Sequence, residues 1–304
     1  MKIIFTSCAR YTKRHTQNEW NKIQHENPDL LLLLGDNIYM DWGIHLYQPL
    51  IRGLNYFKRR MDKKYHLQWA NISFKKLIDT MIQKNGLHGI WDDHDCGWNN
   101  IKVESLSAKN KEKVAYSRQQ FFNKFPFSKN NNSIYYAHDT KSIRFIFLDN
   151  RSFSTKNKLE NKVYLGKEQF DFLEQKLNHN KPITIICGGL TLSSGSEKFL
   201  NYEKAYHKFC QLTNNSPSKV IYLSGDIHKN TFVTSNEGVA SANTKPPFEI
   251  ISSGVARGKN RKHRWTMLNV SNENHIEVSF FNKGNKEITK SNDCTEKLDT
   301  YLSQ

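Results

Sequence analysis

The sequence is short of cysteine, of acidic residues and of long apolar runs. Its 304 residues include five cysteines, at positions 8, 96, 187, 210 and 294, an odd number without a CxxC pair. Neither a disulfide framework nor a zinc ribbon is indicated, and we expect reduced thiols. The longest apolar run, Leu30–Leu34, is far too short to cross a bilayer, and residues 1–5 lack the apolar core of a signal peptide. We therefore expect a cytoplasmic protein.

The shortage of acidic residues gives the chain a strongly positive balance. Lys and Arg number 45 against 29 Asp and Glu, a formal net charge of +16. Such a charge favours acidic or phosphorylated partners, of which nucleic acid is one, but says nothing about the fold. The basic run Arg257–Arg264 would attract a polyanionic substrate; a solvated loop is the alternative interpretation.

Short apolar runs alternate with longer amphipathic stretches, a pattern typical of a layered α/β fold. Strands are predicted over residues 2–7, 29–34, 87–91, 133–138, 144–148, 183–187, 219–224 and 248–252, with a final pair near 265–270 and 275–281. Helices are predicted after the capping-box pattern Thr16-Gln17-Asn18-Glu19 and over 65–83, 109–125 and 166–178. The stretch 37–85 is predicted to be a helical insertion that caps the strand ends.

Polar clusters follow four of the predicted strands. They are Ser7-Cys8-Ala9-Arg10, Gly35-Asp36-Asn37-Ile38-Tyr39, Trp91-Asp92-Asp93-His94-Asp95 and Gly225-Asp226-Ile227-His228. Because the carboxyl ends of strands form the ligand crevice of an open α/β sheet, we expect these clusters to meet in space. Together they offer thiol, phenol, carboxylate and imidazole groups, a set suited to cations. The clusters therefore predict a metal site.

Simpler interpretations exist for single residues of these clusters. Cys8 alone suits a core thiol, Asp36 a helix cap, and His228 a hydrogen-bonded core imidazole. Together they favour a metal site, because adjacent carboxylates after a buried strand repel one another unless cations offset their charge.

The ordered motifs resemble those of the PhoD-like alkaline phosphatases, a family of the metallophosphoesterase superfamily. The motifs are SCxR at residues 7–10, GDxxY at 35–39, WDDHD at 91–95 followed by Asn99, LDxR at 148–151 and LSGDxH at 223–228. The resemblance implies a four-layer α/β/β/α sandwich over residues 1–282, with a C-terminal tail at 283–304. It also implies hydrolysis of phosphoesters by a metal-activated water at a dinuclear or larger site, with the choice between phosphatase and phosphodiesterase left open.

The resemblance further implies a set of metal ligands, with Fe3+ and Ca2+ as the cations and other divalent cations as alternatives. The first metal would be held by Cys8, Asp36, Tyr39 and His228, since thiolate and phenolate suit a ferric ion. Asp36 would bridge to a second metal held by Asp93 and Asp226. Asp92 is an alternative to Asp93, and Asn99 is a further candidate ligand.

Two residues are candidates for catalytic roles. His94 stands where related phosphoesterases place a histidine, so it is the candidate general acid. Arg151 is a candidate clamp for a phosphate oxygen; the alternative is that it pairs with Asp149 or Asp95.

A second hypothesis is a basic sandwich without turnover that binds nucleic acid or another polyanion. We disfavour it, because loss of activity normally removes ligands and all five motifs are intact. The expected partner is thus a phosphoester substrate, with nucleic acid and other polyanions open as substrates.

Overall fold

The computed structural model describes residues 1–12, 17–43, 48–126, 133–156, 162–234, 245–256 and 263–304. Two mixed, six-stranded sheets form its centre. The first runs in the order β12 (Asn285–Lys286), β11 (His275–Asn282), β10 (Arg264–Asn272), β1 (Lys2–Thr6), β2 (Leu30–Leu34) and β3 (Leu87–Ile90). The second runs in the order β4 (Tyr136–Asp139), β5 (Ile143–Phe147), β6 (Ile183–Cys187), β7 (Lys219–Ser224), β9 (Phe248–Ser252) and β8 (Asn230–Val233).

The two sheets pack face to face, and alternate side chains of their strands point toward the other sheet. In the first sheet Phe5 and Leu32 point inward, where they share a buried core with Phe147 and Ile185 of the second sheet. In β1, β2 and β3, and likewise in β5, β6, β7 and β9, neighbouring strands run parallel. Their carboxyl ends therefore lie at the same edge of each sheet, as the ligand crevice of an α/β fold requires.

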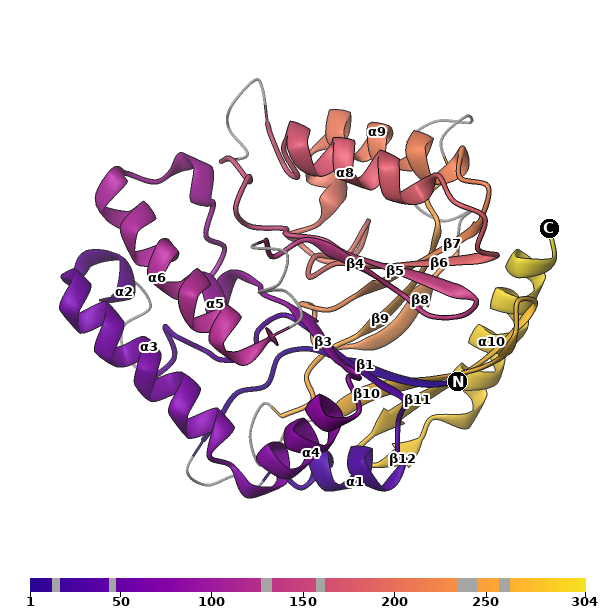
Figure 1. Ribbon diagram of the computed structural model, residues 1–304, viewed down its shortest axis with the longest axis horizontal. Coiled ribbons are helices and arrows are strands. Elements are labelled where there is room, and N and C mark those ends of the chain that lie inside the picture. Colours follow the sequence, from indigo (N-terminus) through magenta and orange to yellow (C-terminus); the bar gives the residue numbers. More distant parts are fainter. Residues whose placement is uncertain (13–16, 44–47, 127–132, 157–161, 235–244, 257–262) are drawn as a thin grey trace.

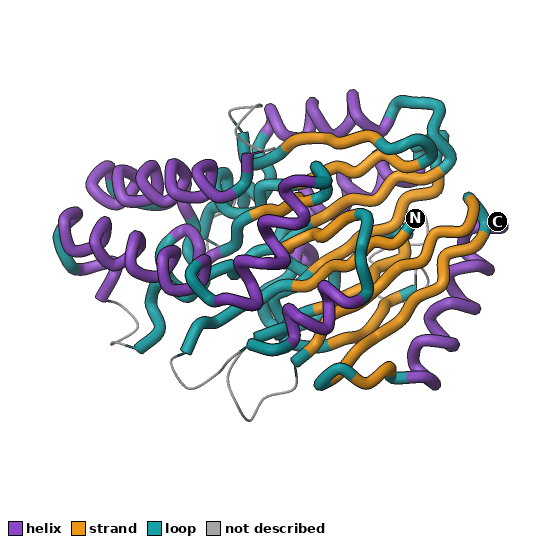
Figure 2. Tube along the Cα trace, turned by 60° about the horizontal axis from the view of Figure 1, so that its bottom comes forward, coloured by secondary structure: helices purple, strands orange, loops and turns teal. Residues whose placement is uncertain are grey.

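Helices cover the two outer faces. The first sheet packs against α1 (Glu19–His25), α3 (Leu54–Trp69), α4 (Ile72–Gln83) and α6 (Ala108–Lys124) through one core, and the second against α8 (Lys167–Leu177) and α9 (Glu203–Asn214) through another. In Figure 1, α8 and α9 lie above the sheets and α1 and α4 below them; Figure 2 shows the strands fanned across the molecule. The predicted α/β/β/α sandwich is confirmed.

The stretch 37–85 divides between two places. Its α2 (Gln48–Ile51) and α3 lie with α6 and the short α5 (Asp93–Cys96) at one end of the sandwich (Figure 1). Its α4 instead packs on α1, so it belongs to the outer layer rather than to a cap. The prediction of a single helix over 65–83 is wrong, because α3 ends at Trp69 and α4 begins at Ile72. Between them, the Asn71 side chain caps α4 by accepting a hydrogen bond from the Phe74 amide at 3.1 Å.

The capping box predicted before α1 would use Thr16 as its N-cap residue. Thr16 lies outside the described residues, and the N-cap residue Asn18 makes no side-chain capping bond. Instead the Trp20 indole donates to the Gln17 side chain at 3.0 Å. Trp20 is fully buried and packs against Phe74 of α4, with the ring centroids 4.8 Å apart.

Residues 283–304 form secondary structure where a tail was expected. They contain β12 and α10 (Ile288–Ser303), whose Cys294, Leu298 and Leu302 are buried in the core between the sheets. The Tyr301 hydroxyl donates to the Val220 carbonyl at 2.8 Å. The three apolar residues recur every four positions, which is the spacing of one helix face, so α10 is held by burial despite its polar composition. No helix among the described residues is long and apolar enough to cross a membrane.

Candidate metal centre

The loops after β1, β2 and β7 reach the candidate site through strained backbone. Cys8, Asp36, Asp226 and His228 all have left-handed conformations, with φ of 62°, 53°, 60° and 55°. Such angles are uncommon outside glycine and persist only where the surrounding structure imposes them. All four residues belong to the ligand set that the motifs imply.

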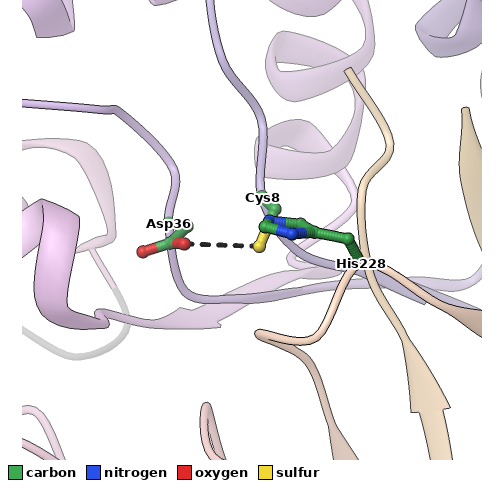
Figure 3. Close-up of side chains that lie close together, drawn as sticks. All are labelled: Cys8, Asp36 and His228. Carbon is green, nitrogen blue, oxygen red and sulfur yellow. Dashed lines mark hydrogen bonds between the residues drawn. The ribbon is translucent and has the colours of Figure 1, made fainter. Parts of the chain in front are cut away.

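A first cluster joins Cys8, Asp36 and His228, whose potential ligand atoms lie within 4.8 Å of one another. The Cys8 sulfur lies 3.3 Å from Asp36 Oδ2, as the dashed line in Figure 3 shows. The Tyr39 hydroxyl lies 3.2 Å from His228 Nε2. The structure thus brings together the four residues expected around the first metal.

A second cluster contains Asp36, Asp93 and His94, again within 4.8 Å. The His94 amide donates to Asp93 Oδ1 at 2.8 Å and to Asp36 Oδ1 at 3.4 Å. Both clusters share Asp36, which is the residue expected to bridge two metals. The second cluster also contains His94, which the sequence suggested as a proton donor rather than as part of a ligand group.

Asp92 faces a different partner from its neighbour Asp93. It accepts a hydrogen bond from Arg151 Nε, while Arg151 Nη1 donates to Glu197 at 3.0 Å. Arg151 is fully buried, and its Nη2 lies 4.0 Å from Asp93 Oδ1. Its guanidinium therefore pairs with Asp92 and Glu197 rather than with the alternatives Asp149 and Asp95.

Asn99 and Asp226 lie at the edge of the centre. Asn99 is exposed, and its amide donates to Asp41 Oδ2 at 3.0 Å. Asp226 is partly exposed, and its carbonyl oxygen lies 3.8 Å from the Cys8 sulfur. The Asp226 carboxylate is in neither cluster, and Asn99 and Asp226 both line a neighbouring cleft of about 770 Å³. Residues 257–262 of the basic run lie outside the described residues. Arg264, at the end of the run, begins β10, and its side chain donates to the His228 carbonyl at 2.7 Å.

The sequence analysis missed Asp41. This carboxylate is fully buried and accepts from His94 Nδ1 at 2.5 Å. The bond fixes the imidazole ring beside the second cluster. Asp41 stands two positions after Tyr39, so its closeness to a motif was the available signal.

Asp95, the last residue of the WDDHD motif, has a structural role that the sequence did not predict. Its carboxylate accepts from the amides of Asn37 and Ile38 at 3.2 and 3.1 Å, and from the Asp92 amide at 2.9 Å. It thereby joins the loops after β2 and β3. Gly35 allows this close approach: it has φ of 87°, and a Cβ there would lie 2.5 Å from the Asp92 Cβ.

Burial and neighbouring charges shift the pKa values of the titratable side chains in the site. Burial, together with the charge of Asp226, raises the pKa of the Cys8 thiol to about 11. Burial and the nearby Cys8 raise the pKa of Asp36 well above its ordinary value. Burial lowers the pKa of His94, but Asp93 and Asp36 outweigh it and bring the pKa to about 10.

These shifts mark a site with excess negative charge. Burial also raises the pKa of Asp226, and Asp92 and Asp93 add to it. Asp92 Oδ2 and Glu197 Oε2 are buried without a hydrogen-bond partner among the described residues. Asp92 and Glu197 have cationic partners in Arg151 and Lys102. The crowded carboxylates of Asp36 and Asp93 instead share the two clusters with sulfur and imidazole donors, a donor set that suits metal cations. The residues present therefore fit bound metal ions.

Two facing sheets with potential metal ligands at the strand ends are the arrangement expected of a metallophosphoesterase-type sandwich. The chain belongs to the PhoD-like phosphatase family, whose model matches residues 3–295. The predicted resemblance is confirmed. Membership in this family implies metal ions.

One solved structure with a TM-score above 0.5 shares the fold. Purple acid phosphatase PPD1 from yellow lupin (Lupinus luteus) seeds is 13% identical with a TM-score of 0.57, over 94% of this chain and 52% of that one. The chain thus spans about half the length of that protein. A 5'-nucleotidase from Candida albicans SC5314 is 11% identical with a TM-score of 0.42, over 99% of this chain and 57% of that one. A comparison with curated protein sequences gave no match.

Proposed function

We propose that the protein is a metal-dependent phosphoester hydrolase whose reaction takes place where the two clusters meet. The observation that carries this proposal is the sharing of the buried Asp36 carboxylate by a cluster with Cys8 and His228 and a cluster with Asp93 and His94. A carboxylate in that position would be shared by two cations, and two-metal sites of that kind stabilise both the attacking and the leaving oxygen in phosphoryl transfer.

The donor chemistry differs between the clusters. Cys8, Asp36, Tyr39 and His228 would hold Fe3+, which accepts thiolate and phenolate ligands. Asp36 and Asp93 would hold a hard cation such as Ca2+, with Asp226 and Asn99 able to complete the ligand set from the cleft edge. When bound, the cations supply Lewis acidity and lower the pKa of a coordinated water.

His94 is the residue we assign to proton donation. In hydrolysis the water oxygen bonds to phosphorus, the bond from phosphorus to the leaving oxygen breaks, and that oxygen takes a proton from His94; the proton that the water oxygen releases then restores the protonated His94. Asp41 accepts from His94 Nδ1 and so holds the ring in one orientation.

Arg151 acts as a positioning residue in this scheme. Its side chain is fully buried and donates to Asp92 and Glu197, so it reaches substrate only through the residues that it holds. Its charge also stabilises Asp93, whose pKa lies below the usual range because His94 and Arg151 outweigh the effect of burial.

The test combines turnover with metal analysis. The purified protein is assayed with a chromogenic phosphomonoester and the matching bis-ester, and its iron and calcium are measured. Visible charge-transfer absorption would accompany iron bound to thiolate and phenolate. Asp36→Asn should reduce turnover at least about 100-fold and lower the metal content, because both clusters lose their shared ligand.

The matched control is Asp79→Asn, the same change on α4, where Asp79 is exposed and paired with Lys75. It should retain wild-type turnover and metal content. Undiminished turnover in Asp36→Asn would refute the shared-carboxylate mechanism, and an active protein without iron would remove Fe3+ from it.

A further inference from the structure

A cleft of about 770 Å³ opens beside the metal centre, and the mechanism above uses only its inner edge. Its walls come from three separate segments, residues 99–100, 194–197 and 226–233. Asp226 belongs to the expected ligand set and lines the cleft, so the cleft begins at the reaction site. Its volume lies within the range of pockets that hold small organic ligands.

The segment after β7 is held in place by hydrogen bonds from two residues that do not line the cleft, His228 and Asn230. The His228 amide donates to Ser253 Oγ at 3.1 Å, and Asn230 Nδ2 donates to the Phe281 carbonyl at 2.8 Å. These bonds tie His228 and Asn230 to neighbouring strands. Ile227, Lys229 and Thr231, between and beyond them, line the cleft.

The opposite wall is held by contact with Ile227. Gly195 has φ of 78°, and a Cβ there would lie 2.7 Å from the Ile227 side chain. Ser194 and Ser196 flank this glycine and also line the cleft. The serines therefore border the cleft on a wall that packs closely against the segment after β7.

Among the charged side chains that line the cleft, one cation is available to bind an anionic ligand. Among the described lining residues the carboxylates are Glu197 and Asp226, and the only cation is Lys229. Glu197 already pairs with Lys102 and Arg151. Lys229 is exposed, forms no ion pair with any described carboxylate, and directly follows His228 of the first cluster.

We propose that this cleft binds the part of the substrate beyond the scissile phosphate, and that Lys229 recognises a second anionic group there. The inference rests on the proposed function and narrows its substrate class to phosphoesters that carry a further phosphate or carboxylate. Serine, threonine and asparagine side chains on the cleft walls suit a polar linker between the two anionic groups.

The test uses matched ligands that differ by one phosphoryl group. Alkanediol monophosphates and bisphosphates of equal chain length serve as substrates, and the corresponding monophosphonates and bisphosphonates serve as non-hydrolysable ligands in calorimetric titrations. Wild-type protein should prefer the member of each pair that carries two phosphoryl or phosphonyl groups. Lys229→Gln should reduce that preference about fivefold, the size expected of one partly exposed charge contact, and the preference should weaken as salt rises.

The matched control is Lys204→Gln, which removes the same charge from the exposed face of α9. It should leave the preference unchanged. An equal preference in wild type and Lys229→Gln overturns the proposal. Equal losses for the ligands with one and with two phosphoryl or phosphonyl groups also overturn it, because Lys229 would then contact the scissile phosphate. A bisphosphonate preference that depends on Lys229, in a protein that hydrolyses no phosphoester, supports the anion site and refutes the proposed function.

Discussion

Replacing Arg151 with methionine would remove a fully buried guanidinium while keeping much of the apolar stem. In the wild type this group donates from Nε to Asp92 and from Nη1 to Glu197. Lys102 also pairs with Glu197, so that carboxylate keeps a cation in the variant. Asp92, only 1% exposed, loses its ion-pair partner.

The expected loss follows from this burial. Removing one partner of a buried ion pair costs about 3–5 kcal/mol, because the other charge is left without compensation. Since Lys102 still compensates Glu197, we expect Arg151→Met to lower the free energy of unfolding by about 3 kcal/mol. Arg144→Met is the matched control: Arg144 donates to Asp139 at 2.8 and 2.7 Å, but the Asp139 side chain is 41% exposed. Its expected loss is about 1 kcal/mol or less.

Urea unfolding in the presence of a chelator, followed by circular dichroism, measures both variants without a contribution from bound metal. Asp92→Asn in the Arg151→Met background should recover part of the loss, because the uncompensated charge is then absent. A loss in Arg151→Met no larger than in Arg144→Met would refute the stabilising role of this buried network. An Asp92→Asn change that recovers nothing would show that the loss has another origin.

Three further predictions concern catalysis, backbone strain and pH. His94→Ala should slow turnover most for substrates with poor leaving groups while metal content is retained; equal slowing across a series of leaving groups would contradict proton donation. Gly35→Ala should reduce turnover and stability, because the φ of 87° disfavours a side chain and the new Cβ would lie 2.5 Å from the Asp92 Cβ. Gly53→Ala is the control: its new Cβ would meet no atom within 4 Å, so neither turnover nor stability should change much. Burial and a neighbouring imidazole lower the pKa of His88 to about 3 from an ordinary 6.5, so its stability contribution is complete above pH 6.5 and is lost as the pH falls toward 3. His88→Gln should flatten this part of the urea-unfolding profile by up to about 1.4 kcal/mol per pH unit, and an unchanged slope would contradict the assignment.

Local sequence pattern was sufficient to predict the central strands. Apolar runs such as Leu30–Leu34 are buried on both faces, and only the interior of a sheet accommodates them. Helix boundaries were harder, because the break between α3 and α4 depends on a cap at Asn71 within an otherwise continuous apolar pattern. The helix α9 had a readable signal, since Tyr206, Phe209, Cys210 and Thr213 recur at helical spacing.

The motifs at the strand ends determined which chemistry the site offers, because residue types and their order along the chain fix the available donor atoms. They did not determine which atoms meet. Asp92 and Asp93 are neighbours in the chain, yet one pairs with Arg151 and the other joins Asp36 and His94. Side-chain direction in a loop follows from backbone angles and from contacts with distant segments, neither of which has a periodic signature.

The cleft and the buried charge network were decided by tertiary structure alone. Arg151 and Glu197 are separated by 46 positions, and the cleft is lined by three segments that no local pattern connects. Their meeting depends on the way two sheets pack face to face and bring their strand ends together. The sequence by itself therefore determined the layered fold and the donor set of the metal centre, while the packing of the sheets decided which donors share a cluster and where Lys229 lies.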